Sequence, residues 1–238
     1  MVLVPERAIR VRKMIESLAE RFPHLKSALH QDTWGYDKTW MVGPVRETKE
    51  LGRDVQTWTQ KYLTAMSLGP WRIQGQVHQK NLLLSQVRDA EWSTLSPLTV
   101  AALPFRLRWQ TQQTTDFHRN LLRSGSTLDA LCEHLLSLTG DAAYHKLADM
   151  SGVRGYSKCV DFFVREALLL DCVPVDRHVR RLLASFDLTG VGRLELTELI
   201  REAGFKPRLV ARVLYEQGLN KSNACPTIRS SRCASERR

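Results

Sequence analysis

Apolar side chains in this chain recur at the three- and four-residue spacing of helices, and the alternation typical of strands is scarce. Residues 5–22 show the helical pattern with Ala8, Val11 and Ile15 on one face. The same reading predicts further helices over residues 50–67, 77–87, 110–123, 126–138, 141–150, 158–168, 179–186, 197–203 and 207–217. We therefore predict an all-α fold.

Polar and proline-bearing segments separate these predicted helices. Ser126 and Asp141 are predicted N-caps, and Pro97 and Pro104 bracket a short helix or turn. The domain organisation that we expect has three parts: an N-terminal helix with an irregular extension over residues 1–48, a main domain over 49–219, and a tail over 220–238. The tail is basic and rich in serine, which predicts disorder.

The chain carries 35 basic and 25 acidic side chains, a net charge of +10 with histidine uncharged. Without its last eighteen residues it retains 30 basic and 24 acidic groups, a net charge of +6. Positive potential favours polyanions, nucleic acid ahead of an anionic membrane surface. High isoelectric points also occur without a specific partner, so charge alone leaves the function open.

The sequence shows neither the pattern of a membrane span nor that of a secretory signal. No apolar run reaches the length of a membrane span, and residues 1–13 lack the apolar stretch and cleavage site of a secretory signal. We expect a chain that is not secreted and does not bind membranes. The expected compartment is the cytoplasm, in association with the nucleoid, or the nucleus.

Five cysteines stand at irregular spacings: Cys132, Cys159, Cys172, Cys225 and Cys233. An odd, irregular set argues against a disulfide framework. The C-terminal region offers only two of the thiolates, which cannot hold an iron–sulfur cluster by themselves. We therefore expect no cofactor and no metal.

Residues 147–181 are the segment most informative about function. They read as a helix end, a glycine-bearing hairpin over 151–155, a second helix, and Asp176 within Val-Pro-Val-Asp-Arg-His. Glycine permits a positive φ, and N–H groups turned outward at a helix start bind phosphate without reading sequence. A simple turn between two helices has the same pattern, but the downstream aspartate favours DNA binding.

Lys158 and Asp176 lie eighteen positions apart and form a chemically suggestive pair. Lys158 precedes the apolar stripe of the second helix, at the end of the helix dipole where cations are disfavoured. A neutral lysine amine can attack C1′ of a deoxyribose and hold the sugar as a Schiff base. Asp176 is predicted to N-cap the next helix, and a fixed anion there can stabilise positive charge on the sugar. The alternatives are a solvated lysine and a cap without chemistry.

Residues 50–218, and most specifically 147–181, resemble the helix-hairpin-helix DNA glycosylases of the endonuclease III superfamily. Phe163-Val164-Arg165 and Asp176-Arg177-His178 are most similar to the archaeal-type 8-oxoguanine DNA glycosylases, which also lack the iron–sulfur loop. The resemblance implies two helical lobes around a DNA-binding cleft. It also implies a glycosylase domain over 49–219, with its hairpin motif over 146–181.

The resemblance further implies removal of oxidised guanine and strand cleavage by β-elimination. Lys158 would be the nucleophile and Asp176 the essential acid. The DNA-binding residues that it implies are Gly152, Val153, Arg154, Gly155, Ser157 and Arg177. The implied partner is double-stranded DNA with a damaged base, bound by a monomer.

The hairpin departs from the family pattern by one residue, which leaves two registers open. Counted forward from Gly155, Ser157 falls in the nucleophile position; counted back from Asp176 and Arg165, Lys158 does. One residue on a helix is a rotation of about 100°, so only one register can hold. We prefer Lys158; with Ser157 the enzyme would be monofunctional, and Asp176 would activate water. A non-enzymatic DNA-binding module of the same fold is a further alternative.

Weaker candidates come from polar, aromatic and basic side chains elsewhere. A glutamine could fill the gap left by a flipped base, an aromatic ring could stack on that base, and arginines could contact phosphates. These candidates are Gln112, Gln113, Phe105, Trp71, Trp109, Arg180 and Arg181. A polar helix surface, core packing and a solvated basic face explain the same residues.

A second glycine turn, Leu-Thr-Gly-Val-Gly over residues 188–192, is closer to a consensus hairpin than residues 150–155 are. No lysine–aspartate pair follows it, and the next predicted helix, 197–203, begins too late for the motif. We predict a helix end and turn here, with a second phosphate-binding hairpin as the alternative.

Overall fold

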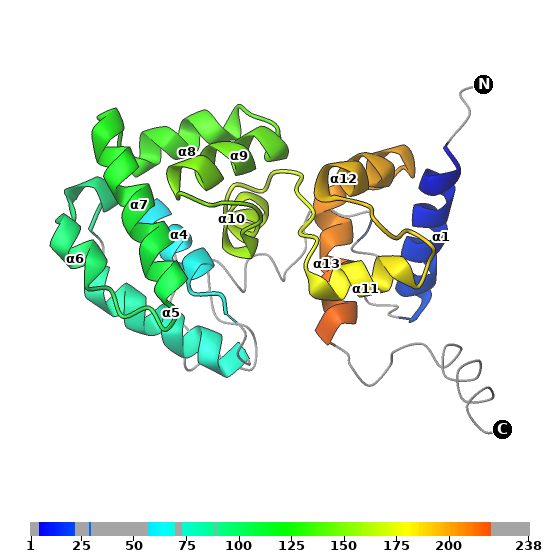
Figure 1. Ribbon diagram of the computed structural model, residues 1–238, viewed down its shortest axis with the longest axis horizontal. Helices are drawn as coiled ribbons and strands as arrows, with labels where there is room; N and C mark the ends of the chain where they lie inside the picture. The colour runs from blue at the N-terminus through cyan, green and yellow to red at the C-terminus, as the bar shows by residue number, and fades with distance from the viewer. Residues whose placement is uncertain (1–4, 22–28, 30–56, 70–72, 89, 220–238) are drawn as a thin grey trace. The chain divides into compact units, whose positions relative to one another are not determined.

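The computed structural model describes residues 5–21, 29, 57–69, 73–88 and 90–219 (Figure 1). These residues form helices joined by turns and contain no strand, which confirms the all-α class. The helices are α1 (Glu6–Arg21), α4 (Trp58–Met66), α5 (Ile73–Val87), η2 (Trp92–Thr94), α6 (Pro97–Ala101), α7 (Arg108–Ser124), α8 (Leu128–Leu136), α9 (Gly140–Met150), α10 (Lys158–Phe162), η3 (Phe163–Ala167), α11 (Arg177–Ala184), α12 (Arg193–Glu202) and α13 (Pro207–Leu219).

The chain divides into two compact units. Unit 1 comprises Met1–His30 and Val175–Arg238, and unit 2 comprises Gln31–Pro174. The N-terminal helix α1 therefore belongs with α11, α12 and α13. The boundary expected at residues 48 and 49, and the predicted tail over 220–238, lie outside the described residues. No helix among the described residues is long and apolar enough to cross a membrane.

Unit 1 is built by α1 packing on α12 and α13, with α11 also against α13. The predicted apolar face of α1 is confirmed, since Ala8, Val11 and Ile15 are fully buried. Arg12 adds a polar contact: its Nε and Nη2 donate to the carbonyl of Ala203 at 2.9 and 2.7 Å, at the C-terminal end of α12. That bond satisfies a carbonyl that the helix itself leaves free.

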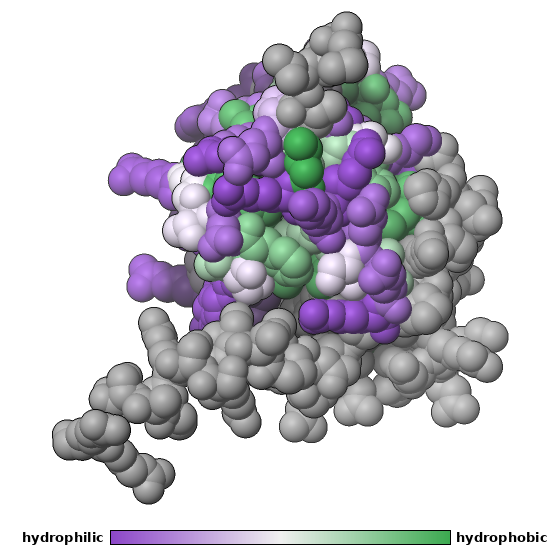
Figure 2. All heavy atoms as spheres, turned by 90° about the vertical axis from the view of Figure 1, so that its right-hand side faces the viewer, coloured by the Kyte–Doolittle hydropathy of each residue, from purple (hydrophilic) through white to green (hydrophobic). Residues whose placement is uncertain are grey.

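The face of unit 1 that Figure 2 shows carries many polar side chains, with hydrophobic residues between them. Figure 2 shows the molecule from the side on which α1 lies in Figure 1, and hydrophilic side chains cover most of its coloured area. Arginines contribute to the exposed part of α11, where Arg177, Arg180 and Arg181 all lie on the solvent side. Their exposure is compatible with both sequence-based alternatives, contact with phosphates and a solvated basic face.

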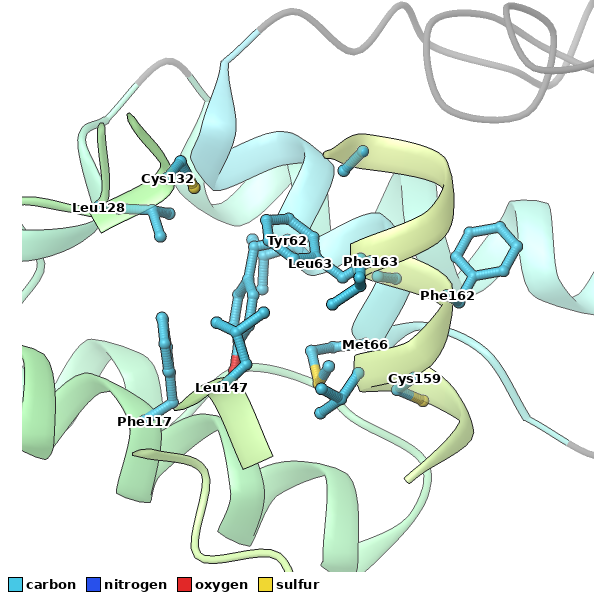
Figure 3. Packing of buried hydrophobic residues seen from close by; sticks show 14 of the residues in the cluster. Tyr62, Leu63, Met66, Phe117, Leu128, Cys132, Leu147, Cys159, Phe162 and Phe163 are labelled. Atoms are coloured by element: carbon cyan, nitrogen blue, oxygen red, sulfur yellow. The ribbon is translucent and has the colours of Figure 1, made fainter. Parts of the chain in front are cut away.

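Aromatic rings form the centre of unit 2. Tyr62 of α4 stacks on Phe117 of α7 with ring centroids 4.4 Å apart, and meets Phe163 edge-on at 5.7 Å. In Figure 3 Phe163 lies beside Tyr62 and Leu63, whereas the preceding residue, Phe162, points away from this group. Such contacts add stability beyond area burial, so they tie α4, α7 and η3 together.

The helix that follows the hairpin changes from α-helix to π-helix halfway along its length. Its predicted apolar face is confirmed, because Val160, Phe163 and Val164 are buried, as are Ala167 and Leu168. This helix is α-helical as α10 up to Phe162 and continues as the π-helix η3. At its end the N–H of Leu168 donates to the carbonyl of Phe163 at 3.1 Å. π-Turns are frequent at functional sites, and apolar spacing alone cannot predict one.

Several helix ends differ from the sequence predictions. The N-caps of α8 and α9 are Thr127 and Thr139, whose hydroxyls accept from the third following N–H, so the predicted caps Ser126 and Asp141 are wrong. Helix α5 begins at Ile73 instead of Val77. The predicted short helix after Pro97 is confirmed as α6, where Ser96 caps and proline takes the first turn.

Candidate functional site

The glycine hairpin predicted between α9 and α10 is present. The N–H of Val153 donates to the carbonyl of Ala148 at 2.9 Å, which closes the end of α9. Gly152 and Gly155 have φ of +62° and +105°, so both occupy a region that suits glycine. A Cβ at position 152 would also lie 3.0 Å from Oδ2 of Asp116 on α7. Glycine at position 152 is therefore favoured by conformation, and a larger residue would also require Asp116 to shift by a few tenths of an ångström.

Asp116 is held by two partners on its own helix. Its Oδ1 accepts from Arg119 at 2.8 Å and its Oδ2 from Gln112 at 2.9 Å. Asn120, one turn further along α7, donates to the carbonyl of Met150 at 2.8 Å. The polar side of α7 therefore lies along the hairpin and supports its first half.

The amide groups of the hairpin divide into used and unused donors. The N–H of Gly152 donates to Asp149 O at 3.1 Å, and those of Val153 and Ser157 also have internal acceptors. The amides of Arg154 and Gly155, two of the predicted DNA-binding residues, donate to no residue of the described chain. Both residues are exposed. These two N–H groups are therefore open to solvent or to a ligand.

Ser157 and Lys158 occupy different positions at the start of α10. Ser157 is buried, and its Oγ caps the helix by accepting from the N–H of Val160 at 3.4 Å. The same hydroxyl donates to Oε1 of Gln113 at 3.3 Å. Lys158 is the first helical residue and is partly exposed. Of the two registers left open by the sequence, the one with Lys158 has the more accessible side chain.

Asp176 is the N-cap of α11, as predicted. Its Oδ1 accepts from the N–H groups of His178 and Val179 at 2.8 and 3.0 Å. Two amides at a helix start hold the carboxylate in one orientation and favour its charged form. Lys158 belongs to unit 2 and Asp176 to unit 1. Arg177 follows Asp176 and is exposed.

Most of the weaker candidates pack or bond within the fold, and one lies outside the described residues. Gln112 donates to Asp116 within α7, and Gln113 accepts from Ser157, so only Gln113 contacts the end of the hairpin directly. Phe105 is partly buried against the core, whereas Trp109 is 42% exposed at the start of α7. Trp71 lies outside the described residues.

Sequence reasoning missed a buried polar group next to the candidate lysine. The continuous helix α10–η3, which begins with Lys158, carries three charged residues that are at most 3% exposed: Asp161, Arg165 and Glu166. Arg165 Nη2 lies 2.9 Å from Glu166 Oε1, and the thiol of Cys172 donates to Asp161 Oδ1 at 2.6 Å. Charged residues on an amphipathic helix are ordinarily read as its solvent face, whereas here all three are buried, Asp161 in α10 and the other two in the π-helix η3.

The buried cysteines do not offer an alternative nucleophile. Cys132, Cys159 and Cys172 are free thiols within the core of unit 2. Burial raises the pKa of Cys132 and of Cys159 to about 12. A thiol must ionise to act as a nucleophile, so neither group is reactive near neutral pH.

Within the described ranges, no group of three or more His, Cys, Asp or Glu side chains could hold a metal ion. The chain matches no family model, no curated protein and no solved structure.

Proposed function

We propose that this chain is a DNA base-excision glycosylase with an associated apurinic/apyrimidinic lyase activity. Its expected substrate is oxidised guanine, such as 8-oxoguanine, in double-stranded DNA, acted on by a monomer in the cytoplasm or nucleus. Two lobes around a DNA-binding cleft and a DNA-binding helix-hairpin-helix motif are parts of this proposal.

One observation carries the proposal: a glycine hairpin with two unused amides leads directly into a helix whose first residue is a partly exposed lysine. The amides of Arg154 and Gly155 supply donors of the kind that bind a phosphate oxygen. Lys158 follows within four residues, so a duplex bound there would have an amine near its backbone.

In the proposed reaction Lys158 is the nucleophile and Asp176 stabilises the charge on the sugar. The neutral amine of Lys158 attacks C1′ of the flipped nucleotide, and the base departs with the electron pair of the glycosidic bond. The carboxylate of Asp176, already fixed by two amides, stabilises the positive charge that develops on the sugar. Ring opening then gives a Schiff base, from which β-elimination expels the 3′ phosphate.

A panel of duplexes, each with a single damaged base, tests the proposed function. Base release and strand nicking are measured separately for each duplex. We expect both on the duplex with 8-oxoguanine, at the same site and without added metal. Absence of base release from every duplex would contradict the proposal.

Replacing Asp176 by Asn separates an enzyme from a DNA-binding module without chemistry. Asparagine caps a helix as well as aspartate does, so α11 should keep its start and the protein its stability. We expect base release to fall by about 10²- to 10³-fold, since a fixed charge is lost from the transition state, with duplex affinity nearly unchanged. A DNA-binding module would behave identically with either residue.

Replacing Lys158 by Gln separates the bifunctional enzyme from a monofunctional one. We expect strand nicking to disappear and base release to fall by about 10³-fold or more. A monofunctional glycosylase with water as nucleophile would keep most of its base release. The buried position of Ser157, with its hydroxyl engaged by Gln113 and Val160, supports Lys158 as the residue to test.

A further inference from the structure

The side chain of Tyr144 binds the second half of the hairpin at two points. Its hydroxyl accepts from the N–H of Ser157 at 2.9 Å and donates to the carbonyl of Gly155 at 3.3 Å. Tyr144 lies in the middle of α9 and is 3% exposed. One buried hydroxyl therefore connects α9 to the backbone on both sides of Tyr156.

The ring of Tyr144 supports the same segment. It stacks on the ring of Tyr156 with centroids 6.4 Å apart and planes 20° from parallel. Tyr156 is 39% exposed, so its outer face remains at the surface of the hairpin. Ring and hydroxyl together hold three consecutive residues, 155 to 157, immediately before Lys158.

Helix α7 completes the set of contacts at Ser157. Gln113 accepts from the serine hydroxyl, which itself caps α10. Side chains from α7 and α9 thus meet at the residue that starts the helix of the candidate nucleophile. Because the N–H of Ser157 is buried, loss of the tyrosine hydroxyl would leave a buried donor without this acceptor.

We infer that Tyr144 is a positioning residue for the reaction proposed above, and the inference rests on that function. Its hydroxyl fixes the path of the chain from Gly155 to Lys158. That path sets where the lysine amine stands relative to a phosphate bound at the amides of Arg154 and Gly155. Small displacements of a reacting group cost rate more than they cost affinity.

The test is Tyr144→Phe in the full chain, which keeps the ring, its stack and its packing and removes the hydroxyl alone. The first turnover of base release is followed as a burst with 8-oxoguanine duplex in saturating excess over enzyme, and the burst rate constant and the burst amplitude are read separately. We expect the rate constant to fall about tenfold while amplitude and affinity for undamaged duplex change less than about twofold. A loss of folded protein would lower the amplitude and leave the rate constant unchanged.

Ser124→Ala is the matched control. It removes one hydroxyl bond to a backbone carbonyl, that of Leu121 at 2.7 Å, at the other end of the neighbouring helix α7. If wild type releases base and Tyr144→Phe has the rate constant of this control, the inference is overturned while the proposed function stands. Wild type without base release on any duplex overturns the proposed function, and the inference with it.

Discussion

Two glycine turns of the described chain, residues 151–155 in unit 2 and 188–192 in unit 1, differ in what holds them. The first is supported by polar side chains from two other helices, among them Asn120 of α7 and Tyr144 of α9. The second is anchored by its own apolar residues Leu188 and Val191, at most 5% exposed, while Gly190 has φ of +82°. Around Gly190 and Gly192 a Cβ would meet nothing within 4 Å.

One sequence-based reason against residues 188–192 as the DNA-binding hairpin is the place where the next helix is expected to begin, and the structure contradicts that reason. Helix α12 begins at Arg193, directly after Gly192, so the prediction that the next helix starts too late is wrong. The turn over 188–192 is therefore also a hairpin between two helices. What distinguishes the first turn is its polar support and the lysine that follows it. Consensus in a short motif reports the geometry of a turn, whereas the surrounding contacts indicate what the turn positions.

The largest expected difference between the two helix pairs lies at the glycines near the starts of α9 and α12. A Cβ on Gly140 would stand 1.9 Å from the backbone oxygen of Asp171, so Gly140→Ala must displace the main chain. We expect a loss of at least about 3 kcal/mol in the free energy of unfolding, measured by urea denaturation. Gly192→Ala, with open space around it, is the control and should change stability by less than about 1 kcal/mol.

A smaller difference is expected at the turn glycines themselves. Gly152→Ala adds a contact with Asp116 to the strain of a positive φ, and should cost about 3 kcal/mol. Gly190→Ala carries the strain alone and should cost about 1 to 2 kcal/mol. Urea denaturation of both variants measures the gap. Equal losses would mean that α7 does not constrain the first turn.

The smallest effect tests the proposed contact of the first turn with DNA. Arg154→Ala should weaken duplex binding by roughly fivefold and reduce the slope of log affinity against log salt by about 1, as for one lost phosphate contact. Arg193→Ala, the first helical residue after the second turn, should leave both quantities almost unchanged. Titrations at three salt concentrations measure this. The opposite result would transfer the DNA contact to the second turn.

Apolar spacing was sufficient for the existence of most helices and for the faces that they bury. The ends were harder, because adjacent residues competed for the same role: Ser126 with Thr127, and Thr139 with Asp141. All four side chains can cap a helix, and only the backbone conformation decides which one does. Asp176 was predicted correctly because Val-Pro-Val before it excluded a helical start further upstream.

The site was predictable in its local parts and not in its long-range ones. Positive φ at Gly152 and Gly155 follows from the residue type in a short turn. The bonds from Asn120, Gln113 and Tyr144 join residues separated by 11 to 44 positions, so no local pattern could predict them. The polar run that includes Gln112 and Gln113 was the one visible signal, and its partner is the hairpin.

Borohydride trapping on duplex with a single 8-oxoguanine tests the central claim most directly. Wild type should form a covalent protein–DNA adduct, and mass spectrometry of its peptides should place the modification on Lys158. The Lys158→Gln variant should form none. Base release by wild type without any adduct, or an adduct on a different lysine, would contradict the assignment of Lys158 as nucleophile.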